Sequence, residues 1–145
     1  MTTCGRSCPN SRQRSGRAME FHSDSDRLES GEFRGVVAWQ RAMDLSMTIY
    51  QATEAWPLVD PLDLRLDVRR NAVIVPSKIA RGFGMGEPDA LRECLQLSAD
   101  TARQIAAQIG LAVRIGYSSK EVAAVLWTEI EETICEIETL QRSIV

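Results

Sequence analysis

The fold of this chain is indicated by the stretch RRNAVIVPSKIARG, which runs from Arg69 to Gly82. Its apolar residues recur at the three- and four-residue spacing of a helix. Pro76 lies inside this helix, where it removes one backbone N–H and is expected to bend the axis. Upstream, Asp60-Pro61 combines a capping carboxylate with a proline suited to the first helical turn. We therefore predict a helix over residues 60–82 that ends at Gly82.

Three further segments show the same period and end at recognisable signals. Pro57 ends the first, Gly116 ends the second, and Ser118-x-x-Glu121 opens the third as a capping box. No segment alternates with a period of two, so no strand is expected. The connections are short, including a glycine-rich loop at residues 82–86, and this predicts an all-α, up-down-up-down antiparallel four-helix bundle. The three other predicted helices cover residues 34–56, 88–116 and 118–144.

The composition is typical of a soluble globular domain. The chain has 145 residues, of which 44% are hydrophobic and 26% charged, and its net charge is -3. No apolar run is long enough to span a membrane, and no secretory signal is recognisable, so a cytoplasmic location is expected. Because residues 1–17 contain four arginines and no acidic residue, the remaining chain carries a net charge of -7. This acidic balance argues against non-specific duplex binding driven by total charge.

Composition divides the chain into two parts. Residues 1–32 are rich in Ser, Arg, Gly and Asp without an apolar period, which predicts a disordered N-terminal tail. Residues 33–145 are predicted to form the bundle domain. Met19 offers an alternative start, and we hypothesise that residues 1–18 belong to the gene model and not to the translated protein. Peptides containing Arg12 or Arg14 in the native protein would contradict this hypothesis.

Several motifs fall in an order that resembles one family. The chain is similar to the bacterial four-helix-bundle proteins known as the 23S rRNA intervening-sequence-encoded protein family. It resembles more distantly the accessory protein of diversity-generating retroelements. The resemblance implies a four-helix bundle that assembles as a homopentamer, without a firm biochemical activity. It also suggests association with RNA or a ribonucleoprotein. The motifs are Val37-x-Trp39-Gln40-x-Ala42, Arg69-Arg70, Pro76-Ser77-x-Ile79-Ala80-x-Gly82 and Gly116-Tyr117.

The chain also departs from the family pattern. Lys78 stands where the family usually has Asn, and Arg81 stands where it has Glu. In the next helix Gln104 replaces another usual Glu. Two characteristic carboxylates are therefore missing, so any site that they form in relatives is lost or replaced here. We interpret the chain as a divergent member.

Catalytic and metal chemistry find little support in the sequence, and we expect no cofactor. The single histidine, His22, lies in the tail, so the predicted bundle offers no histidine base or ligand. A zinc site built from His22 and Cys4-x3-Cys8 would lack a fourth ligand. Glu129-x-x-Glu132 is similar to the magnesium-binding acids of all-helical nucleotide pyrophosphohydrolases. The required second acidic pair is missing from the helix at 88–116, so a degenerate metal-dependent hydrolase remains only an alternative.

Basic residues gather on the predicted helix at 60–82, whereas the helix at 118–144 is acidic. One interpretation is structural, with the two helices pairing electrostatically within or between subunits. The functional interpretation is that the cations contact nucleic-acid phosphate, and a ring of subunits would repeat each of them. The candidate nucleic-acid-binding residues are Arg65, Arg69, Arg70, Lys78 and Arg81.

Together these observations predict a non-enzymatic, cytoplasmic, homo-oligomeric scaffold or adaptor that associates with RNA or a ribonucleoprotein through these cations. An alternative is a protein-binding module that uses the acidic face of the helix at 118–144. Trp39, Tyr50 and Trp56 are expected to anchor the core or a subunit interface and not to stack on a ligand.

Overall fold

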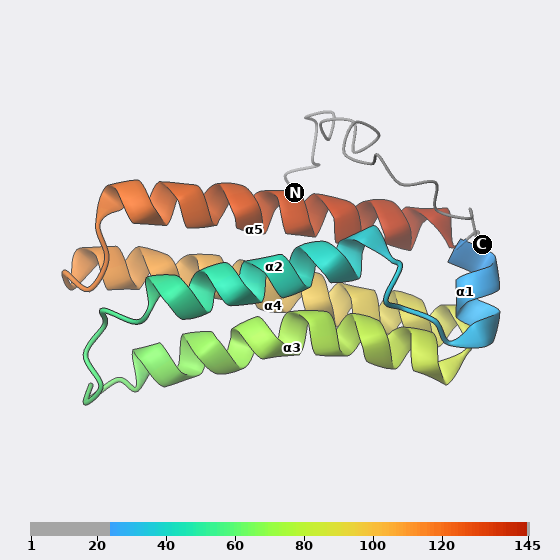
Figure 1. The fold of residues 1–145 in the computed structure, drawn as a ribbon, viewed down its shortest axis with the longest axis horizontal. Coiled ribbons are helices and arrows are strands. Elements are labelled where there is room, and N and C mark those ends of the chain that lie inside the picture. Colours follow the sequence, from blue (N-terminus) through green and yellow to red (C-terminus); the bar gives the residue numbers. More distant parts are fainter. Residues whose placement is uncertain (1–23, 145) are drawn as a thin grey trace.

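The computed structural model describes residues 24–144, and these residues form helices without any strand (Figure 1). The prediction of an all-α fold is therefore confirmed for this part of the chain. None of these helices is long and apolar enough to cross a lipid bilayer. The elements are α1 (Asp24–Ser30), α2 (Val37–Ala52), α3 (Leu64–Met85), α4 (Pro88–Arg114) and α5 (Lys120–Ser143).

The four long helices lie side by side around one apolar core (Figure 1). α2 packs against α3 and α5, and α4 packs against the same two helices. Each helix turns the apolar side of its 3.6-residue period towards the centre, as expected for amphipathic helices. The largest fully buried side chains are Phe83, Leu45, Ile49, Ile79, Leu91, Leu95, Ile105, Ile109, Leu126, Ile130, Ile137 and Val68.

The short helix α1 lies within the segment for which the sequence predicts disorder. It contacts α3, and Leu28 packs against the core, so for residues 24–30 the structure differs from that prediction. Leu28 is the single apolar residue of this polar segment, and one apolar residue cannot establish the period that predicts a helix. Residues 1–23 lie outside the described structure, and the predictions that concern Met19, His22 and the N-terminal cysteines lie outside it with them.

The end of α3 differs from the prediction. Gly82 does not end the helix, which continues to Met85 and is capped by Gly86 with a φ of 73°. A Cβ at Gly82 would lie 2.8 Å from Leu91 Cδ1 and 3.0 Å from Cys94 Cβ. Gly82 therefore allows α3 and α4 to approach closely, and only the last residue of the predicted loop at 82–86 lies outside the helix.

Two predicted helix starts are also shifted. The cap of α5 is Ser119 and not Ser118, because the Ser119 hydroxyl accepts the Val122 N–H at 3.1 Å. α3 begins at Leu64, later than predicted. The N-cap residue is therefore Asp63 and not Asp60 as predicted, although the Asp60 carboxylate still accepts the N–H of Leu64, the first helical residue, at 2.9 Å.

The helix predicted at residues 34–56 is shorter in the structure, because α2 covers only Val37–Ala52. Thr53 caps it, and the chain then turns so that Trp56 is buried. Trp39 packs partly against the core beside Phe33, with ring centroids 5.2 Å apart. Tyr50 is different, since half of its surface is exposed on the outer side of α2.

Candidate functional site

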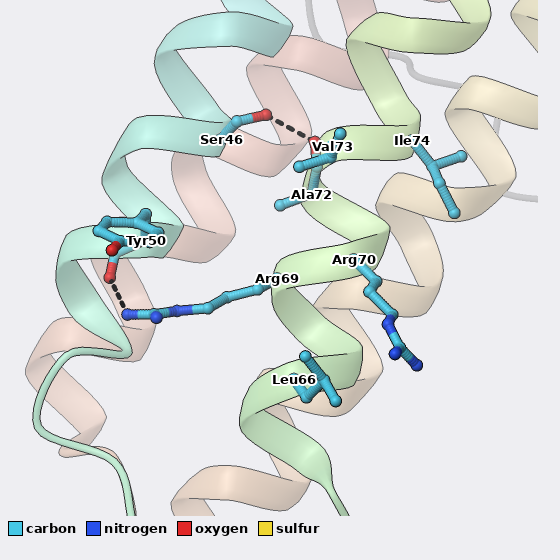
Figure 2. A pocket seen from close by; sticks show the side chains of 8 residues that line it. All are labelled: Ser46, Tyr50, Leu66, Arg69, Arg70, Ala72, Val73 and Ile74. Carbon is cyan, nitrogen blue, oxygen red and sulfur yellow. Dashed lines mark hydrogen bonds between the residues drawn. The ribbon is translucent and has the colours of Figure 1, made fainter. Parts of the chain in front are cut away.

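A groove lies on the outer face between α2 and α3 (Figure 2). Its volume is about 550 Å³, and most of its lining is apolar. Three large side chains in the lining are strongly exposed: Tyr50 at 52%, Leu66 at 48% and Val73 at 61%. The outward faces of both helices thus supply apolar surface that the bundle core does not use. The groove is lined by Ser46, Tyr50, Leu66, Arg69, Arg70, Ala72, Val73 and Ile74.

Ser46 supplies a hydrogen bond that the backbone of α3 lacks beneath this groove. Pro76 has no N–H, so the Ala72 carbonyl four residues earlier loses its helical donor. The Ser46 hydroxyl, projecting from α2, donates to this carbonyl at 2.6 Å (Figure 2). It also lies 2.9 Å from the carbonyl of Ala42 on its own helix. One hydroxyl therefore holds the two helices together where proline interrupts the hydrogen bonding of α3.

Arg69 is directed towards α2 and forms two hydrogen bonds there (Figure 2). Its Nε donates to Thr53 Oγ1 at 2.8 Å, and its Nη2 donates to the Tyr50 carbonyl at 2.9 Å. The guanidinium carbon also lies 4.0 Å from the centre of the Tyr50 ring. Because the last carbonyls of a helix carry partial negative charge, a cation at the C-terminal end of α2 is stabilising. Arg69 thus joins α3 to α2.

Arg65 has a similar role one turn earlier. Its Nη1 donates to the Trp56 carbonyl at 3.2 Å, in the connection between α2 and α3. Arg65 and Arg69, both predicted to contact nucleic acid, therefore already bind the carbonyls of this protein. The sequence places them on α3 but does not indicate which neighbouring helix they face.

The other three candidate cations are free of such contacts. Within residues 24–144, Arg70, Lys78 and Arg81 form no ion pair and no side-chain hydrogen bond. Arg70 and Arg81 are exposed, whereas Lys78 is half-buried. Figure 2 shows Arg70 pointing away from α2. Arg70 and Arg81 are about three helical turns apart, so they lie near one face at a separation of about 16 Å.

The acidic residues of α5 do not pair with α3 in the described part of the chain. Arg41 of α2 binds Glu132, with Nη1 and Oε2 2.8 Å apart, and Arg103 of α4 binds Glu138. The other glutamates of α5 form no ion pair among residues 24–144. Electrostatic pairing of α3 and α5 within one subunit is therefore absent from the described part of the chain. These remaining glutamates are Glu121, Glu129, Glu131 and Glu136.

Asp60 ties together two connections at one end of the bundle. Its buried carboxylate accepts the N–H groups of Leu62 at 3.1 Å and Leu64 at 2.9 Å, and the Tyr117 hydroxyl at 2.9 Å. Burial raises the pKa of the Asp60 carboxyl, but the three hydrogen bonds outweigh it, so the pKa lies below its usual value. The hydrogen bond to Asp60, followed by partial burial, raises the pKa of Tyr117.

The described residues contain no group of three or more His, Cys, Asp and Glu side chains placed to hold a metal ion. The groove combines an apolar lining with Arg70, which forms no ion pair in the described part of the chain. Sequence reasoning did not identify Ser46 as part of it. The available signal was Pro76, since the missing N–H of a proline predicts an unpaired carbonyl four residues earlier.

Comparison with known proteins identifies a family for this chain. No curated protein matches the chain. The family model described as 23S rRNA-intervening sequence protein matches residues 34–139, which include the groove, the α3 cations and most of α5. The match covers more than half of the sequence, and it confirms the resemblance drawn from the Trp-Gln, Arg-Arg and Gly-Tyr motifs. The chain therefore belongs to the 23S rRNA-intervening sequence protein family.

Proposed function

We propose that this protein is a non-enzymatic scaffold or adaptor in the cytoplasm that works as a homo-oligomer, with a homopentamer as the expected assembly. The observation that carries the proposal is the exposed apolar groove between α2 and α3. Contiguous apolar surface on a soluble protein usually belongs to an interface. The exposed methionines of α2, Met43 and Met47, extend this surface beyond the groove and suit a packing face that adapts to a partner.

The proposed architecture has four long helices that alternate in direction. Two features support the alternation. Consecutive helices pack side by side, and the connections from α3 to α4 and from α4 to α5 are short. In Figure 1 the colour gradient also reverses from each long helix to the next. An oligomer of such bundles repeats the same groove on every subunit.

The experiment for this proposal is the mass in solution, by sedimentation velocity or light scattering. We expect five times the mass of one chain at micromolar concentration. Leu66→Asp should shift the protein towards the monomer while circular dichroism remains helical. Leu97→Asp is the matched control, because Leu97 is exposed to a similar degree (46%) but lies on α4. A wild-type protein that sediments as a single chain across the working concentration range would overturn the proposal.

A second part of the proposal is association with RNA or a ribonucleoprotein through Arg70, Lys78 and Arg81. The supporting observation is that these cations have no partner in residues 24–144, whereas Arg65 and Arg69 are engaged. Repetition around a ring would multiply this small patch into a strong local field.

Binding of labelled RNA at several salt concentrations tests this part. Changing Lys78 and Arg81 together to Ala should lower affinity and flatten the salt dependence, because each lost phosphate contact reduces the slope by about 0.7. Arg114→Ala is the control, since Arg114 is an exposed arginine of α4 without an ion pair in the described residues. Equal binding by the double variant and the control would reject the RNA contact.

A further inference from the structure

Apolar and charged side chains follow one another along the α3 side of the groove between α2 and α3. Leu66 contributes an exposed apolar side chain, and Arg70 follows four residues later with a free guanidinium. Val73 continues the apolar surface beyond Arg70. Four residues of helix rise about 6 Å, so a helix that complements both side chains would carry an acidic residue about 6 Å from an apolar one.

α5 carries that arrangement on its surface. Val122 and Val125 are exposed at 43% and 57%, and Glu129 follows Val125 by four residues on the same face. Glu129 has no ion pair in the described part of the chain, so its carboxylate is available. The spacing from Val125 to Glu129 equals that from Leu66 to Arg70.

The direction of the helices also fits. With the alternation proposed above, α3 and α5 run in the same direction within a subunit. A rotation axis parallel to the bundle preserves that direction in every copy. α3 of one copy and α5 of the next therefore lie parallel in such a ring, and a parallel alignment allows Leu66 to face Val125 while Arg70 faces Glu129.

α4 offers a competing surface, because Glu93 and the exposed Leu97 are also four residues apart. Net charge favours α5. The three acidic residues of α4 are balanced by three arginines, whereas α5 has six glutamates against one lysine and one arginine. α3 carries five cations and one acidic residue, so it complements α5 much better than α4.

We infer that the α2–α3 groove of one copy receives α5 of a neighbouring copy, with Arg70 paired to Glu129 across the interface. This inference rests on the proposed homo-oligomer and specifies its contact. Arg70 then belongs to the interface, and the proposed RNA contact falls to Lys78 and Arg81. The two surfaces are different, so the interface is head-to-tail and closes into a ring and not into a two-fold dimer.

Charge reversal tests the contact. Arg70→Glu and Glu129→Arg should each raise the subunit dissociation constant about tenfold or more, measured by sedimentation velocity over a dilution series. Arg70 is exposed and Glu129 is half-buried, so circular dichroism checks that each variant remains folded. The double variant should restore association. Mixing the two single variants should also restore it, because each then offers the other a complementary surface.

The outcomes separate this contact from the proposed function. A wild-type monomer overturns both. If the wild-type protein is an oligomer and neither single change weakens it, the α3–α5 contact is wrong but the proposed homo-oligomer is not. Rescue of Arg70→Glu by Glu93→Arg in place of Glu129→Arg would also overturn it, in favour of α4.

Discussion

The hydrogen bond from Ser46 to the Ala72 carbonyl predicts a specific energetic coupling between α2 and α3. Ser46→Ala removes the side-chain donor that replaces the N–H missing at Pro76. Pro76→Ala returns a backbone N–H to the same carbonyl. The two changes therefore act on one acceptor, and their effects on the free energy of unfolding should not add.

The magnitude follows from the burial of the acceptor. Ala72 is 3% exposed, and leaving a buried carbonyl without a donor costs about 1–3 kcal/mol. Ser46 is half-buried, so water reaches part of the site, and we expect a loss in the lower half of that range. In the Pro76→Ala background the carbonyl is already paired, and Ser46→Ala should cost less by about 1 kcal/mol.

Urea denaturation followed by circular dichroism, at one fixed protein concentration, measures the cycle. Thr48→Ala is the matched control, because the Thr48 hydroxyl donates to the Asp44 carbonyl of its own helix at 3.0 Å. That acceptor keeps its backbone donor, so Thr48→Ala should cost the same in both backgrounds. If Ser46→Ala costs as much in the Pro76→Ala background as in the wild-type protein, the hydroxyl does not replace the missing N–H.

Three further predictions concern stability. Arg69→Ala should lower the free energy of unfolding by about 1–3 kcal/mol, because the Thr53 hydroxyl and the Tyr50 carbonyl lose a charged donor. Arg70→Ala should leave the free energy of unfolding unchanged when thermal melts compare samples with the same fraction of assembled protein. The lowered pKa of Asp60 stabilises the fold above the carboxyl's unfolded pKa, and this is lost as pH falls through the folded value. Asp60→Asn should therefore flatten the acidic limb of a stability–pH profile, and an unchanged limb would contradict this. In urea denaturation, Gly84→Ala should stabilise the protein by about 0.5–1 kcal/mol, because the added Cβ meets no other atom and alanine favours the helix. Gly82→Ala should destabilise it by about 1 kcal/mol, because the added Cβ would press against Leu91 and Cys94.

The sequence predicted the helices better than their ends. Apolar spacing located all four long helices, and Pro88 and Gly116 lie at the expected ends of α4. Gly82 was misassigned because the same residue type both ends helices and permits close helix contact, and only the position of α4 distinguishes the two. Ser118 and Ser119 are adjacent residues of one type, and which one caps α5 depends on the turn after α4.

The candidate site was predicted only in part. A helical period of 3.6 residues assigns Arg65, Arg69 and Arg70 to the non-core side of α3, and the structure agrees. The helical period does not indicate that Arg69 reaches the C-terminal carbonyls of α2 while Arg70 remains unpaired, because this difference depends on the residue at which α2 ends. The groove lies between two consecutive helices, and which of their exposed side chains face each other depends on how α2 and α3 pack, which periodicity within one helix does not indicate.

The bond from Tyr117 to Asp60 has a consequence for the order of folding. It joins two connections 57 residues apart, so it forms only after both helical hairpins have come together and the intervening loop entropy has been lost. Such a contact belongs on the native side of the folding barrier. Its loss in Tyr117→Phe would then appear as faster unfolding with an almost unchanged refolding rate, and would shorten the lifetime of the native state without slowing its formation.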